Sequence, residues 1–312
     1  MISGGYRKLA IATCVGMLIV LLGGALVTNT DSGDGCGTDW PLCHGRFIPA
    51  RTLESAIEYS HRFFTGIVTL LIVAICVATW RLARRTDRPD PEPIWYAGSI
   101  LAFTIVQSLM GAAAVKWPQS SQVMALHFGI SLFAFASTML LVLWVLRRKD
   151  PAERVAPSVP RGVFPFALAV SAYSLIVIYL GAYIRHTDSS GGCGTDWPLC
   201  NGALVPELEG ATLIAFVHRL AAALFLVLAI LLHAYIRRRR ADRGTTRVAD
   251  WILGLTFGQV LSGALVAWTV GNEDLFIFTS LLHNLVICGL FSLLADLTIQ
   301  SGLHRAGGGR RG

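Results

Sequence analysis

The octapeptide CGTDWPLC occurs twice, at Cys36–Cys43 and again at Cys193–Cys200. The two copies lie 157 residues apart and hold four of the seven cysteines. At the same offset, the dipeptide His61-Arg62 aligns with His218-Arg219. Further along, Gln-x-Leu-x-Gly-Ala occurs at 107–112 and at 259–264, an offset of 152, which we attribute to a change in loop length. A nearly constant offset over most of the chain indicates a duplicated structural unit.

The composition is that of a membrane protein. Of 312 residues, 54% are hydrophobic and only 14% are charged, whereas about 25% is usual for a soluble domain. Apolar runs of about 20 residues, the length that crosses a bilayer as a helix, can be marked eight times. They are 9–28, 61–80, 94–115, 124–146, 163–184, 213–236, 250–270 and 275–299. The sequence predicts an all-α integral membrane protein with eight transmembrane helices.

The chain has a net charge of +7. Its basic residues are distributed as in a membrane protein, where they mark one side of the membrane, and not as in a nucleic-acid-binding surface. Alternate connections and both termini carry most of the basic residues: Arg7, Lys8, Arg81, Arg84, Arg85, Arg88, Arg147, Arg148, Lys149, Arg154, Arg161, Arg237 to Arg240, Arg243, Arg247, Arg305, Arg310 and Arg311. The other connections hold only Arg46, Arg51, Lys116 and Arg185. By the positive-inside rule, both termini are expected in the cytoplasm. Nucleic acid is therefore not an expected partner.

Each half contains four of the expected helices, and an even number returns the chain to the side on which it began. We expect two four-helix bundles, at 1–148 and 162–304, related by a pseudo-two-fold axis along the membrane normal. The Arg- and Pro-rich link between them is expected in the cytoplasm. Arg7 and Lys8 precede the first apolar run as in a signal peptide, but no A-x-A-like cleavage site follows, so we interpret this run as a retained helix.

Four of the eight histidines lie near the outer ends of the even-numbered helices: His61, His127, His218 and His283. A single such histidine is most simply an interfacial or hydrogen-bonded residue. Two at equal depth within one bundle, repeated in the second bundle, favour axial ligation of a haem iron instead. Bare zinc fits less well, because no third or fourth ligand shares this level within a half.

The two halves differ at one position beside these histidines. Glu58 lies one helical turn before His61, whereas Ala215 takes the same place before His218. Glu58 is a candidate proton acceptor or polar stabiliser, or simply the i,i+4 partner of Arg62. Arg62 and Arg219 are candidates for contacts with haem propionates, with interfacial snorkelling as the alternative.

Both octapeptides fall in long loops on the expected outer side, where thiols are oxidised. We therefore expect disulfides Cys36–Cys43 and Cys193–Cys200, each closing a short ring. A structural staple is the simpler interpretation for the second pair, whereas a redox role is equally plausible for Cys36 and Cys43, beside Glu58. The C-x₆-C spacing by itself does not indicate a thioredoxin-type catalyst.

These residues together resemble the haem A synthase family, in its cysteine-bearing bacterial branch. The resemblance rests on E-x-x-H-R at Glu58–Arg62, the later His218-Arg219, His127, His283 and both CGTDWPLC loops. It implies oxidation of the C8 methyl of haem O to a formyl group through haem I, which yields haem A for terminal oxidases. It also implies haem b on His218 and His283, substrate haem on His61 and His127, and Glu58 close to the reaction.

The same resemblance implies a multi-pass protein of the bacterial plasma membrane. Its expected partners are haem O, an electron acceptor, haem O synthase and assembly factors of the terminal oxidase. The alternative is a non-enzymatic di-haem b membrane cytochrome that passes electrons between a quinone and an outer-side partner. Two equivalent permanent haems would then be expected, and Glu58 in one half only would have no explanation.

Overall fold

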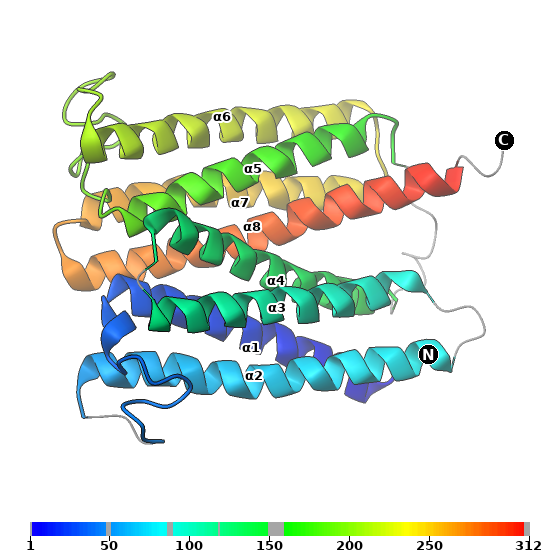
Figure 1. The fold of residues 1–312 in the computed structure, drawn as a ribbon. Helices are drawn as coiled ribbons and strands as arrows, with labels where there is room; N and C mark the ends of the chain where they lie inside the picture. Colours follow the sequence, from blue (N-terminus) through cyan, green and yellow to red (C-terminus); the bar gives the residue numbers. More distant parts are fainter. Residues whose placement is uncertain (1, 48–50, 86–89, 118, 149–158, 309–312) are drawn as a thin grey trace. The chain divides into compact units, whose positions relative to one another are not determined.

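The structure is a computed structural model that describes residues 2–47, 51–85, 90–117, 119–148 and 159–308, with side chains described up to 303. Within these residues the chain forms eight long α-helices and one short 3₁₀-helix, η1 (Ser32–Asp34). The long helices are α1 (Gly4–Asn29), α2 (Leu53–Arg84), α3 (Pro91–Lys116), α4 (Ser121–Arg147), α5 (Val163–His186), α6 (Gly210–Arg238), α7 (Arg243–Thr269) and α8 (Glu273–Gly308) (Figure 1). All eight are long and apolar enough to cross a membrane, which confirms the predicted all-α membrane class.

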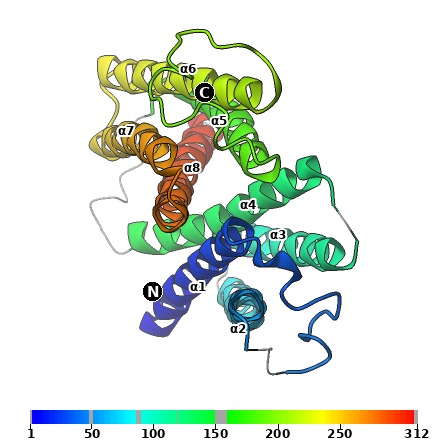
Figure 2. The same cartoon turned by 90° about the vertical axis from the view of Figure 1, so that its left-hand side faces the viewer.

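The chain divides into two compact units, Met1–Lys149 and Asp150–Gly312. In the first unit, α1 and α3 each pack against both α2 and α4. The second unit repeats this arrangement, since α5 and α7 each pack against both α6 and α8 (Figures 1 and 2). Each unit is thus a four-helix bundle in which consecutive helices are neighbours. The pseudo-two-fold axis between the bundles stays a prediction.

Polar side chains at the helix starts explain where several helices begin. The side chains of Ser3, Thr52, Asp90, Ser120 and Asp242 each accept a hydrogen bond from a backbone N–H in the first turn of α1, α2, α3, α4 and α7, respectively. These N-caps satisfy donors that have no partner within the helix. They lie outside the apolar runs, so the helices extend beyond the predicted spans.

Helix α2 shows the largest extension at its start. It begins at Leu53, eight residues before the apolar run predicted at 61–80. These two turns contain Glu54 and Glu58, which lower the local hydropathy without disfavouring a helix. Glu58 is therefore a helical residue of α2 with a fixed orientation relative to His61.

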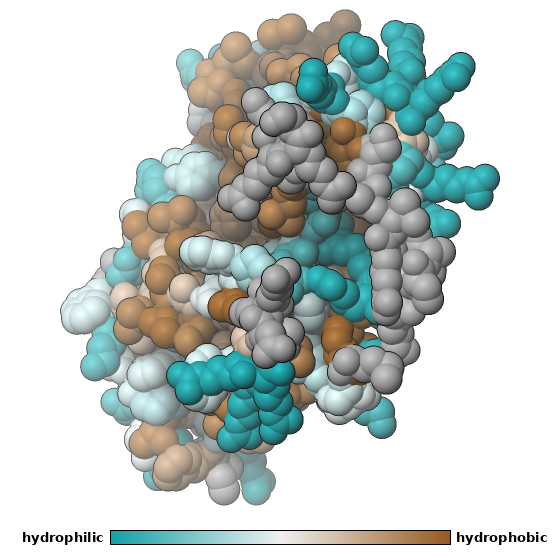
Figure 3. Space-filling model, turned by 90° about the vertical axis from the view of Figure 1, so that its right-hand side faces the viewer, coloured by the Kyte–Doolittle hydropathy of each residue, from teal (hydrophilic) through white to brown (hydrophobic). Residues whose placement is uncertain are grey.

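Within each unit, ion pairs connect the basic ends of the helices to acidic residues of a neighbouring helix or its N-cap. Arg147 pairs with Glu92 at 3.2 Å, and Arg148 pairs with Asp90. In the second unit, Arg237 donates to both carboxylate oxygens of Asp250, at 2.8 and 2.9 Å. Hydrophilic side chains gather over this α6–α7 end (Figure 3). The basic residues expected on one side of the membrane thus lie at the helix ends.

Candidate functional site

The two octapeptides form the same covalent loop. Cys36 bonds to Cys43 and Cys193 bonds to Cys200, so both expected disulfides are present. Each loop is closed by a pair of backbone hydrogen bonds three residues apart, between Cys43 and Arg46 at 3.0 Å, and between Cys200 and Ala203 at 3.0 and 3.1 Å. All four cysteines are buried. The loops are therefore compact caps, each packed against the start of the helix that follows it.

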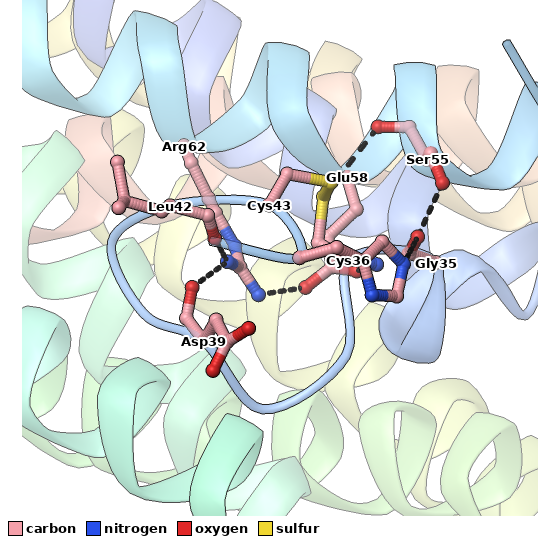
Figure 4. Close-up of polar contacts among 9 residues, drawn as sticks. Gly35, Cys36, Asp39, Leu42, Cys43, Ser55, Glu58 and Arg62 are labelled. Atoms are coloured by element: carbon pink, nitrogen blue, oxygen red, sulfur yellow. Dashed lines mark hydrogen bonds and ion pairs between the residues drawn. A yellow bond between two sulfur atoms is a disulfide. The ribbon is translucent and has the colours of Figure 1, made fainter. Parts of the chain in front are cut away.

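Glu58 joins helix α2 to the first of these loops (Figure 4). Its side chain is only 5% exposed. One carboxylate oxygen, Oε2, accepts a hydrogen bond from the backbone N–H of Cys36 at 2.7 Å, and the other, Oε1, pairs with the guanidinium of Arg62. The i,i+4 pair considered from the sequence is present, and the contact with the disulfide loop adds to it. Both carboxylate oxygens are thus tied to positive or hydrogen-bond-donating groups.

The arginine after each histidine holds the disulfide loop in both units. Arg62 donates from Nη1 to the backbone carbonyls of Asp39, at 3.3 Å, and Leu42. Arg219 donates from Nη1 to the carbonyls of Asp196, at 2.6 Å, and Leu199. Because the four carbonyls occupy matching loop positions, this clamp belongs to the duplicated unit. Contact of either arginine with a propionate stays a prediction.

The second unit replaces the carboxylate with an apolar contact. Ala215, at the position of Glu58, is 5% exposed and packs with the Cys193–Cys200 disulfide, together with the half-buried Phe216. A methyl group there fills the space beneath the loop without a charge to satisfy. The two units therefore share one loop scaffold and differ in whether a buried carboxylate contacts it.

Each of the four candidate ligand histidines packs against a glycine of the preceding helix. A Cβ atom added at Gly24, Gly111, Gly181 or Gly263 would lie 3.0 to 3.6 Å from Cε1 of a histidine ring. The pairs are Gly24 with His61, Gly111 with His127, Gly181 with His218, and Gly263 with His283. These glycines occupy matching positions of the two repeats. At Gly24, Gly181 and Gly263 the distance is 3.0 to 3.3 Å, so an added Cβ would require the ring to shift, whereas 3.6 Å at Gly111 is an ordinary van der Waals contact.

Two of these histidines form a hydrogen bond at Nε2 with a glutamine on the neighbouring helix. Gln107 lies 2.8 Å from Nε2 of His127, and Gln259 lies 2.9 Å from Nε2 of His283. Both glutamines therefore connect neighbouring helices. Each glutamine thus places its side-chain amide beside Nε2, the ring nitrogen at which a histidine can bind a metal.

The arrangement fits a haem better than a bare metal ion. Among the residues that the structure describes, no group of three or more His, Cys, Asp or Glu side chains could hold a metal ion. A haem iron needs only two axial ligands from the protein. Nδ1 of His61 and of His218 is buried without a hydrogen-bond partner. These features suit imidazoles that ligate a haem.

Comparison with known proteins places this architecture in a family. The sequence signature of the COX15-CtaA family, described as a cytochrome oxidase assembly protein, matches residues 7–295. The chain belongs to this family. A protein named "Heme A synthase" from Shouchella clausii is 37% identical over 97% of this chain and 99% of its own length. Proteins with the same name from Exiguobacterium sibiricum, 39% identical over 91% of both chains, and Symbiobacterium thermophilum, 39% identical over 93% of this chain and 94% of the relative, are also similar.

Two contacts of this COX15-CtaA protein escaped the sequence reasoning. The amide of Cys36 as a partner of Glu58 depends on how the loop folds back, which no local pattern reports. The contact of Ser262 with Nδ1 of His283, at 2.8 Å, is likewise not predicted by the sequence, although Ser262 lies inside the repeated Gln-x-Leu-x-Gly-Ala motif. In the first copy of the motif, Met110 takes the position of Ser262. This difference between the two copies is the signal in the sequence that points to Ser262.

Proposed function

We propose that the protein is a haem A synthase, which oxidises the C8 methyl group of haem O through haem I to the formyl group of haem A. The observation that carries the proposal is similarity over nearly the full length to proteins named "Heme A synthase". In each of the two units, two histidine rings pack against glycines of the preceding helices. Two such pairs are what a protein that binds two haems would need.

The two units take different roles in this proposal. His61 and His127 hold the iron of the substrate haem in the first unit, and His218 and His283 hold a resident haem b in the second. The support is the placement of the one buried carboxylate beside these histidines, at Glu58 in the first unit, where the second has Ala215. When bound, haem b would supply one-electron transfer. Haem O carries a long isoprenoid tail, so entry from the lipid phase is the natural route.

Glu58 is proposed to take up or relay the proton released when the methyl carbon is oxidised in two-electron stages. It lies one turn from His61 on α2, and its charge is balanced by Arg62 and by the Cys36 amide. Arg62 and the Cys36 amide thereby hold the carboxylate in one orientation on α2. The Cys36–Cys43 disulfide positions the loop that supplies this amide, so these cysteines support the chemistry through Glu58.

The cellular setting belongs to the same proposal. The basic helix ends, such as Arg81 to Arg85 and Arg237 to Arg240, face the cytoplasm of a bacterial plasma membrane, and both termini lie on that side. The disulfide loops then face the oxidising side. Proposed partners are haem O synthase, which makes the lipophilic substrate, an electron acceptor, and assembly factors that receive haem A.

Extraction of the pigments from the purified protein tests this function. A haem A synthase expressed with its substrate contains haem O, haem I or haem A beside haem b. The competing di-haem cytochrome would contain haem b alone, at two per chain. Detection of haem b alone in cells that supply haem O would overturn the proposal.

A further inference from the structure

Ser262 lies on α7, one turn after Gln259, and its hydroxyl joins two groups. The Oγ atom lies 3.0 Å from the backbone carbonyl of Gln259 and 2.8 Å from Nδ1 of His283 on α8. The serine is only 3% exposed. A buried hydroxyl with two partners at these distances is held in one orientation.

The positions of the hydrogens follow from what each partner can do. A backbone carbonyl only accepts, so the single hydrogen of the Ser262 hydroxyl goes to Gln259. The same oxygen must then accept from His283, which places the ring hydrogen on Nδ1. At the other side of the ring, Nε2 lies 2.9 Å from the side-chain nitrogen of Gln259, a contact that an iron bound at Nε2 would replace. His283 is thus a neutral imidazole with a lone pair on Nε2.

We propose that Ser262 is a positioning residue for His283: it fixes the ring orientation and the tautomer that presents Nε2 to the iron of haem b. The inference rests on the proposed function in assigning that iron to the second unit. A ligand imidazole that donates its other N–H to a fixed acceptor is a stronger and better oriented ligand. The carbonyl of Gln259 polarises the hydroxyl in the same direction, which strengthens the effect.

The first unit lacks this device at the aligned position. Met110 stands there, and a thioether is a weak acceptor. The nearby hydroxyl in the first unit comes instead from α4, where Ser131 contacts Gln107 and the carbonyl of its own helix at His127. Ser262 therefore distinguishes the unit assigned a resident haem from the unit assigned an exchangeable substrate. A site that keeps its haem benefits from a histidine ligand held in one orientation, whereas a site that releases its haem does not need one.

The test compares purified full-length wild-type protein with Ser262→Ala, Ser262→Thr and the aligned control Met110→Ala. Haem b transfer to excess apomyoglobin measures haem retention, and a redox titration gives the midpoint potential. We expect S262A to release haem b about 10-fold faster, because removal of such an outer-shell partner weakens metal binding by that order. Its midpoint potential should shift to a more positive value, because a less basic imidazole stabilises the ferric iron less. S262T, which keeps the hydroxyl, and M110A should both behave as wild type.

Equal haem release and equal midpoint potential in S262A and wild type would overturn the role of Ser262. If S262A folds poorly, Ser262→Cys replaces it, since its weaker acceptor should give a smaller shift of the same sign. A parallel His283→Ala variant separates the two proposals. Loss of haem b in H283A with no effect of S262A removes only the Ser262 inference, whereas unchanged haem b in H283A removes the ligand assignment itself.

Discussion

Glu58 combines two roles that a substitution can separate. A glutamine keeps a side-chain oxygen that can accept the hydrogen bond from the Cys36 amide, but it cannot take a proton. If Glu58 is the proton acceptor, Glu58→Gln and Glu58→Ala should both lower the rate of haem A accumulation by about 100-fold or more. Haem b content should stay at the wild-type level, because the second unit is untouched.

The control for this pair is Ser60→Ala, an exposed residue on the same helix, which should leave the rate unchanged. Quantification of haems O, I and A in membranes gives the measurement. A rate near wild type in E58Q together with a low rate in E58A would show that Glu58 only positions the loop.

Arg62 and Arg219 form a natural matched pair, because both clamp a disulfide loop through two backbone carbonyls. Only Arg62 also neutralises a buried carboxylate. Removing one partner of a buried ion pair costs about 3 to 5 kcal/mol, since the other charge is left uncompensated. We therefore expect Arg62→Ala to lower the unfolding midpoint in detergent more than Arg219→Ala. In the E58A background the effect of R62A should shrink toward that of R219A, and an undiminished effect there would contradict this account.

At the residue scale, contacts that follow from spacing along one helix could be predicted from the sequence, whereas contacts between a loop and a helix could not. The i,i+4 relation of Glu58 and Arg62 follows from helix geometry, so the sequence predicts it. The bond from the Cys36 amide and the packing of Ala215 on its disulfide depend on how each loop folds back onto its helix. Such tertiary contacts have no periodic signal.

At the scale of helices, glycines set how closely the histidine-bearing helix approaches its neighbour. A Cβ atom at Gly181 on α5 would lie 3.0 Å from Cε1 of His218 on α6, whereas one at Gly254 on α7 would meet nothing within 4 Å. Gly181→Ala should therefore displace the His218 ring and lower the haem b content per chain. Gly254→Ala should leave haem b unchanged and stabilise its helix by up to about 1 kcal/mol.

Pyridine haemochrome spectra of the two purified glycine variants give the haem content. Equal haem b in G181A and G254A would show that the ring tolerates the extra methyl group and that the close approach has no part in ligation.

The helices themselves were predictable because a bilayer demands about 20 apolar residues for each crossing. Their ends were not, because hydropathy does not register polar turns that continue a helix outside the hydrocarbon. Helix α2 shows this, since Thr52 caps it well before the apolar run begins. The two turns gained there carry Glu58, so the least predictable part of the helix holds a candidate catalytic residue.

At the scale of the whole chain, duplication supplies two similar scaffolds and a few substitutions make them unequal. Glu58 against Ala215 and Met110 against Ser262 are differences that bear directly on the histidine sites. The repeat and these differences can be read from the sequence alone. What each difference contacts required the structure, since Ser262 meets His283 across two helices.

The proposed assignment of haem b to the second unit and of the substrate haem to the first predicts that histidine variants of the two units lose different pigments. His218→Ala and His283→Ala should lose haem b, because each removes one of two proposed axial ligands. His61→Ala and His127→Ala should keep haem b but retain no bound haem O or haem I and form no haem A. Optical spectra and pigment extraction of the four purified variants, with His44→Ala as an exposed control, make the comparison. If H61A lowers haem b as much as H218A does, the two units do not hold separate haems, and the assignment of substrate and cofactor to different halves is wrong.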